Sequence, residues 1–258
     1  MKNKIHTRRG CRYSPPLIRS QSGQSMAEFI VILPVMLLLL FGSIQFALIF
    51  HAKITLNYAA FEAVRYGSLG QGKFAEVKEG FARGLAPLYS YFESDQEIRK
   101  NRKGDVAEDQ IEAFQMARTK IYNEFDSRNK LVRIERLNPT DASFLDFSPD
   151  QEIPNTNLTY RSSAIAGKSK ASIQDSNLLH LRVTYWYPLY VPLINKLIFN
   201  TFICCKTGEG LNSFCKWSED PVCMDNDQEP VIPLTATAVM RMQTPLVKSD
   251  GYFDPNLL

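Results

Sequence analysis

Residues 23–50 have the sequence GQSMAEFIVILPVMLLLLFGSIQFALIF, which decides how the rest of the chain is placed. From Phe29 to Phe50 there are 22 residues without an ionisable side chain. As a helix they reach about 33 Å, close to the hydrocarbon thickness of a bilayer. A buried core helix is seldom apolar on all sides for so long. The stretch therefore predicts a transmembrane helix, and Pro34 and Gly42 inside it are tolerated in such helices.

The charges on the two sides of this run differ in sign. The chain of 258 residues carries a formal net charge of +3, from 30 basic and 27 acidic residues. Residues 1–23 contain six bases and no acid, so they carry +6, and the other residues hold 24 bases against 27 acids, or −3. Basic residues favour the cytoplasmic side of a membrane helix. We therefore expect a cytoplasmic N-terminus and an exported chain after about His51, without the concentrated basic surface that nucleic-acid binding needs.

A cleaved secretory signal is the alternative explanation for a basic segment followed by an apolar run. Such a signal has an apolar core of about 7–15 residues, followed by small residues at the cleavage site. Here the run is longer, and its end is filled by bulky side chains, at Phe46, Leu48, Ile49 and Phe50. We therefore expect the helix to be retained as an anchor.

A glycine and a glutamate precede the apolar run at a defined spacing. Gly23 is followed at the fifth position by Glu28 and then by Phe29, between the acid-free segment and the run. This arrangement resembles type IV prepilins, and more closely the TadE/TadG-like pseudopilins of the tight-adherence pilus system. The resemblance implies that a membrane prepilin peptidase cuts after Gly23 from the cytoplasmic side. Gln24 would then be the new N-terminus and Glu28 the fifth mature residue.

The resemblance also implies an assembly role for Glu28 and the adjoining Phe29. In pilins, the glutamate is thought to meet the free N-terminal amine of a neighbouring subunit. The physics agrees, because either charge alone is costly in a low-dielectric site and the two charges compensate each other. Gln24 stands where type IVa pilins usually have phenylalanine, so N-methylation of the new terminus stays open.

The similarity continues beyond the membrane, in AKITLNYAAFEAVRYGSLG at 52–70. It implies that the anchor helix continues and packs partly on its own domain and partly on neighbouring subunits. Small residues there allow another element to approach closely. The small residues are Ala59, Ala60 and Ala63, whereas the larger side chains Ile54, Tyr58, Phe61 and Arg65 follow helical spacing.

The remainder predicts further helices and strands. Apolar residues at helical spacing indicate helices at about 74–91 and 106–125, and a strand is plausible at 131–137. The stretch 138–177 is rich in Pro, Ser, Asn and Asp without a sustained period, which indicates a long loop or a variable insertion. Alternation predicts a strand at 178–187, with Leu179, Leu181, Val183 and Tyr185 on one face.

A second alternating segment, at 234–242, predicts another strand. Both alternating segments are also similar to the closing region of TadE-like chains. The implied fold class is α+β, with an N-terminal transmembrane helix and a small antiparallel sheet. We expect a basic leader at 1–23, an anchor helix at 24–53 and an extracytoplasmic domain at 54–258.

Four cysteines, Cys204, Cys205, Cys215 and Cys223, cluster within 20 residues on the side expected to be exported. In an oxidising compartment they favour two disulfides, each contributing about 3 kcal/mol. Three pairings are possible, although adjacent Cys204 and Cys205 are expected to take separate partners. The cluster has neither C-x-x-C spacing nor a nearby histidine, which argues against zinc. We expect disulfides that staple the loop near 204–223, and no metal.

Enzymatic functions find little support in this sequence. It has three histidines: His6 in the expected leader, His51 at the membrane boundary and His180 in an expected strand. They are too scattered to suggest a metal triad or a histidine proton relay. GSLGQGK at 67–73 matches part of a phosphate loop, but Phe74 stands where such loops need Ser or Thr. The sequence predicts no catalytic residues and no cofactor.

Two functions from different classes stay open. The first is a minor pseudopilin of the bacterial inner membrane with a periplasmic C-terminal domain, which takes part in assembling a tight-adherence (Flp-type) pilus. Its expected partners are the lipid bilayer, prepilin peptidase, other pilins or pseudopilins and the inner-membrane pilus machinery. The alternative is an unprocessed, membrane-anchored binding module of an envelope complex. Whether a pseudopilin of this kind enters the filament or stays in the assembly machine is also open.

Overall fold

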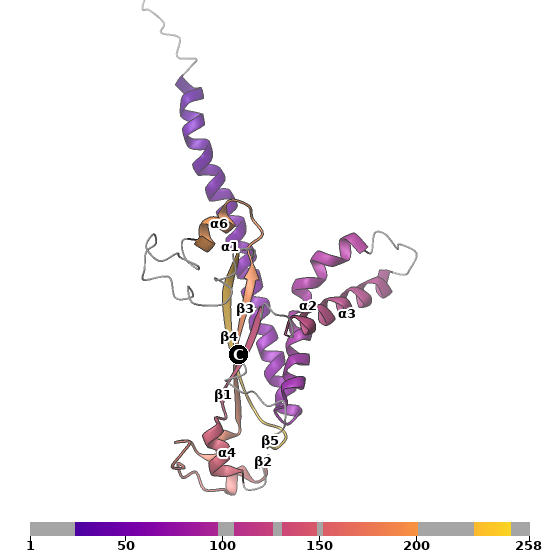
Figure 1. Cartoon of the computed structure of the whole chain (residues 1–258), viewed down its shortest axis with the longest axis vertical. Coiled ribbons are helices and arrows are strands. Elements are labelled where there is room, and N and C mark those ends of the chain that lie inside the picture. Colours follow the sequence, from indigo (N-terminus) through magenta and orange to yellow (C-terminus); the bar gives the residue numbers. More distant parts are fainter. Residues whose placement is uncertain (1–23, 98–105, 126–130, 149–151, 201–229, 249–258) are drawn as a thin grey trace, which may run out of the picture. The chain divides into compact units, whose positions relative to one another are not determined.

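The structure is a computed structural model that describes residues 24–97, 106–125, 131–148, 152–200 and 230–248 (Figure 1). The chain divides into two compact units, Met1–Leu40 and Phe41–Leu258. Helix α1, Gln24–Leu69, begins in the first unit and ends in the second. In the first unit, every side chain from Glu28 to Leu40 is exposed. The predicted long apolar helix is confirmed, and as the family resemblance implied, it continues beyond residue 53.

The second unit combines a three-stranded antiparallel sheet with the rest of α1 and further helices. The sheet has the order β1–β3–β4, with β1 at Val132–Asn138, β3 at Leu178–Pro188 and β4 at Val231–Arg241. Helices α2, Phe74–Glu97, and α3, Val106–Glu124, form a pair (Figure 1). A two-stranded sheet joins β2, Glu152–Ile153, to β5, Leu246–Val247. This architecture confirms the predicted α+β class.

The central strand β3 pairs with β4 over its whole length, from Leu178 opposite Arg241 to Pro188 opposite Val231. The four residues expected on one face, Leu179, Leu181, Val183 and Tyr185, are all buried. Thr184 and Trp186 on the other face are buried as well. Trp186 packs with Val231 of β4, so the second half of β3 is covered on both faces. Alternation alone predicted only the first of these faces.

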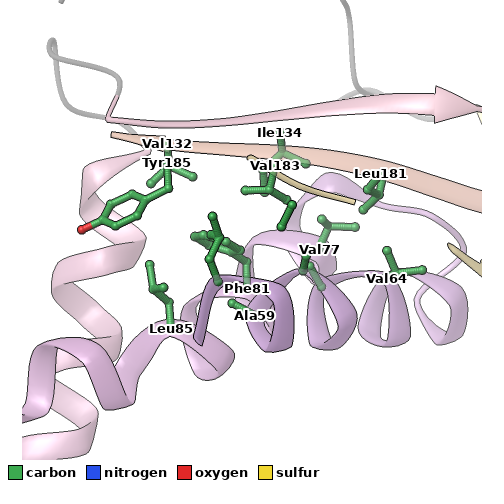
Figure 2. Close-up of a cluster of buried hydrophobic side chains, with 14 of the residues drawn as sticks. Ala59, Val64, Val77, Phe81, Leu85, Val132, Ile134, Leu181, Val183 and Tyr185 are labelled. Atoms are coloured by element: carbon green, nitrogen blue, oxygen red, sulfur yellow. The ribbon is translucent and has the colours of Figure 1, made fainter. Parts of the chain in front are cut away.

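The hydrophobic core lies between the sheet and helices α1 and α2 (Figure 2). At one end of it, the hydroxyls of Tyr89 in α2 and Tyr185 in β3 are 2.6 Å apart and share a hydrogen bond. Burial raises the pKa of Tyr185 well above its usual value. Figure 2 shows the core side chains of the helices, Ala59, Val64, Val77, Phe81 and Leu85, pointing toward those of the strands, Val132, Ile134, Leu181, Val183 and Tyr185.

Small residues allow α1 and α2 to approach closely. Ala59, Ala60 and Ala63 are fully buried. A Cβ added at Gly84 of α2 would lie 2.5 Å from the Cα of Ala59, and one at Gly80 would lie 2.6 Å from the carbonyl oxygen of Glu62. The element that the alanine-rich segment was predicted to accommodate is therefore α2.

The prediction of a long loop at 138–177 is wrong for the residues that the structure describes. They include α4 at Asp141–Phe147, β2, a 3-10 turn at Leu158–Tyr160 and α5 at Ile173–Ser176. These elements are too short for a period to show in the sequence, yet they bury Phe144, Ile153, Leu158 and Ile173. Local hydrogen bonds hold them, as in the capping box of Ser172 and Asp175 that begins α5.

The two helices predicted after α1 are confirmed, with one difference in α3. Of its apolar residues at helical spacing, Ile121 is buried, whereas Ile111 and Phe114 are exposed. The pattern therefore predicted the helix correctly, but apolar spacing alone does not show how much of the helix is buried. Only the second half of α3 meets the core, through Ala117 and Ile121.

Replacing Gly84 with alanine is expected to lower the free energy of unfolding by about 1–3 kcal/mol, because the added methyl group has no room beside Ala59. This net loss already includes the gain of about 1 kcal/mol that alanine brings to a helix interior. Gly167→Ala is the control, since nothing lies within 4 Å of a Cβ there. The midpoints of thermal unfolding are compared for the full-length variants in detergent. A Gly84→Ala midpoint equal to or above that of the parent would show that the helices are not this close.

Candidate interaction surface

The residues predicted for processing and assembly lie at the start of α1. Gly23 lies outside the described residues, and α1 begins at the next residue, Gln24. Glu28 and Phe29 are both exposed. Because residues four apart share a face of a helix, Glu28 lies one turn from Gln24 on the same face. The helix thus carries a carboxylate close to the residue that would follow a cut at Gly23.

The disulfide candidates, Cys204, Cys205, Cys215 and Cys223, lie outside the described residues, so the two disulfides stay a prediction. Of the histidines, His51 belongs to α1 and His180 to β3, while His6 lies outside the described residues. Within the described part of the chain, no group of three or more His, Cys, Asp or Glu side chains is placed to hold a metal ion.

Beyond residue 43, α1 has two different faces. The inner face, which includes Ala52, Leu56, Ala59, Ala63 and Val64, is fully buried. The opposite side carries a row of large side chains, three or four residues apart up to Phe61 and then about two turns further at Leu69, each 46–68% exposed. We call this row the outer stripe: Phe46, Phe50, Ile54, Tyr58, Phe61 and Leu69. An exposed apolar row of this length is typical of a surface that another molecule covers.

Charges beside the outer stripe are engaged in local ion pairs. Arg65 lies 3.3 Å from Glu62. Arg83 of α2 donates to Glu79 at 2.8 Å and to the hydroxyl of Tyr66 at 3.0 Å. The hydrogen bond to Glu79 raises the pKa of Arg83 above its usual value. Exposed pairs of this kind contribute little to stability, so the chemistry of the stripe is chiefly that of its apolar side chains.

The part of the chain that matches a known protein family lies almost entirely in this helix. Residues 23–65 match the family model of the TadE-like proteins. No curated protein and no solved structure matches the chain.

The TadE-like segment covers α1 from its first residue to Arg65, including Glu28 and most of the outer stripe. It confirms the family resemblance found in the sequence, on about a sixth of the chain. A TadE-like segment indicates involvement in the Tad pilus system and association with pilus assembly machinery. Helix α1 is long and apolar enough to cross a membrane, which indicates single-pass anchoring.

Gln45 is a contact residue that the sequence analysis missed. It lies within the apolar run, and its side chain is fully buried. Its Oε1 accepts a hydrogen bond from the backbone N–H of Val191, at 2.9 Å. The signal available in the sequence was an amide side chain inside a largely apolar run, a position where a polar group needs a hydrogen-bond partner.

Two substitutions distinguish the faces of α1. Leu56→Ala on the inner face is expected to lower the free energy of unfolding by about 2–5 kcal/mol, because it leaves a cavity in the core. Phe61→Ala on the outer stripe is expected to change it by less than about 1 kcal/mol, because nearly half of that side chain is already exposed. Denaturant unfolding of the detergent-solubilised subunit measures both. Equal losses would mean that the outer stripe is packed within the subunit.

Proposed function

We propose that this chain is a minor pseudopilin, a subunit that takes part in assembling a tight-adherence (Flp-type) pilus. It is anchored in the bacterial inner membrane by α1, with its leader in the cytoplasm and its C-terminal domain in the periplasm. Prepilin peptidase removes the leader after Gly23, and Gln24 begins the mature subunit.

One observation carries this proposal, namely that α1 combines three features in a single TadE-like helix. It has a carboxylate at Glu28, the apolar run that follows, and the outer stripe, which extends from Phe46 inside the run to Leu69. A plain membrane anchor needs only the apolar run. The carboxylate and the stripe instead favour a helix that packs against other subunits.

Lateral packing explains why large apolar side chains stay exposed on α1. Removing a large apolar side chain from water contributes about 1.5–3 kcal/mol when it is fully buried. The stripe has six such residues, so even partial coverage by a neighbouring helix stabilises an assembly. We therefore propose that the subunit works by association and not by catalysis.

Glu28 serves in this proposal as the partner of a neighbouring N-terminal amine. Leader removal creates that amine at Gln24, one helical turn away from Glu28 on its own chain. At the edge of the membrane, a carboxylate and an amine from adjacent helices compensate each other's desolvation. Processing and assembly are thereby linked, because an uncut leader leaves no amine at this position.

Processing is tested by intact-mass analysis of the membrane protein with and without co-expressed prepilin peptidase. We expect the active peptidase to shorten the chain by the 23 residues of the leader and to leave Gln24 first. Gly23→Leu should stay uncut. A retained Met1 beside an active peptidase, or a Gly23→Leu chain cut at the same bond, would contradict processing and favour the alternative, an unprocessed binding module of an envelope complex.

The role of Glu28 is tested in cells that carry the complete pilus system. Glu28→Ala is expected to insert into the membrane at the normal level but to yield few or no pili, because the neighbouring amine loses its carboxylate. Glu112→Ala changes an exposed glutamate of α3 and serves as the matched control. Electron microscopy counts the pili, and immunoblots of membrane fractions measure insertion. Normal numbers of pili with Glu28→Ala would contradict the assembly role of this residue.

A further inference from the structure

The segment that follows β3, residues 189–198, exposes large apolar side chains. Its sequence is LYVPLINKLI, and α6 occupies Ile194–Ile198 within it. Leu193 is 77% exposed and Leu197 52% exposed. Single exposed leucines are ordinary on protein surfaces, but here two of them lie one helical turn apart. We call residues 189–198 the apolar segment.

The backbone holds Leu193 in an unfavourable conformation. Its φ is 69° and its ψ is −53°, and the N–H of Ile194 donates to the carbonyl of Pro192 at 2.9 Å. These values describe a γ-turn of the rare positive-φ form, which is strained for a residue with a side chain. Val191 and Ile194 on either side are buried. The turn is thus fixed on both sides while Leu193 projects from it.

Gln45 ties the apolar segment to the membrane part of α1. The hydrogen bond between Gln45 and the N–H of Val191 joins residues 146 positions apart in the chain. Gln45 lies five residues before the end of the apolar run at Phe50, which corresponds to about 7–8 Å of helix. Val191 therefore contacts α1 within the apolar run, at a position expected to lie inside the bilayer. In such a place a backbone N–H needs a protein partner, and Gln45 supplies one.

We propose that the apolar segment is a second membrane contact, inserted into the leaflet on the side of the C-terminal domain. Leu193 and Leu197 lie among the outer parts of the acyl chains, at the depth of about 5–10 Å that is typical of interfacial helices. Lys196 is exposed beside them and reaches the lipid phosphates. The segment contains no Asp or Glu that would oppose anionic lipids. This inference rests on anchoring by α1 and not on the role in a pilus.

Photocrosslinking to lipids tests the proposal with the full-length protein. Benzoylphenylalanine is placed at Leu193 or Leu197, and the protein is reconstituted in vesicles of phosphatidylethanolamine and phosphatidylglycerol. Tyr160 is the first control, because it is 91% exposed. Its 3-10 turn is bonded to Gln174 of α5, beside the start of β3. The apolar segment follows the other end of this strand, about 33–36 Å away. Asn57 is the second control, an exposed residue of α1 about 10 Å beyond the apolar run.

We expect illumination to add the mass of one phospholipid at positions 193 and 197, and not at 57 or 160. Position 197 gives the same information if the strained turn does not accept the larger side chain at 193. Lipid adducts at neither 193 nor 197 would overturn the proposal. So would adducts there that join two copies of the chain, because the segment would then be a protein interface.

Discussion

The close packing of α1 against α2 and the sheet is the contact on which the second unit depends. It requires small residues. A Cβ at Gly84 would lie 2.5 Å from the Cα of Ala59, and one at Gly67 would lie within 3 Å of side-chain atoms of both Val77 and Leu179. Close packing of this kind leaves no room for large side chains between the elements. The inner face of α1 is therefore built mainly from small residues around Leu56 and Val64, and the aromatic side chains Phe46, Phe50, Tyr58 and Phe61 lie on the other side, in the outer stripe.

This division gives one helix two kinds of environment. In the first part of the apolar run, residues 29–41, α1 is apolar on all sides, as a lipid-facing helix must be. From Phe46 on, both faces carry apolar side chains, but the subunit covers only the inner face. The outer stripe is then available to a neighbouring helix without any rearrangement of the core. The membrane anchor and the proposed assembly surface are thus successive parts of the same element, which is also the part that matches the TadE-like family.

The sequence predicted those features that repeat over several turns or alternate over several residues. The apolar run, the buried face of β3 and the small residues of α1 are of this kind, and the structure confirms each of them. Features that depend on distant residues could not be predicted. The covering of Trp186 and the bond from Gln45 to Val191 join separate parts of the chain. The short elements between 138 and 177 rest on local hydrogen bonds, which leave no period in the sequence.

Photocrosslinking from the outer stripe tests most directly whether α1 joins this subunit to its neighbours. Benzoylphenylalanine replaces Phe61 in cells that assemble pili, and in the control it replaces Tyr160, which is 91% exposed and belongs to a 3-10 turn outside α1. We expect illumination to join position 61, and not position 160, to another pilin-like subunit. Assembled pili without such an adduct from position 61 would contradict the proposed role of α1.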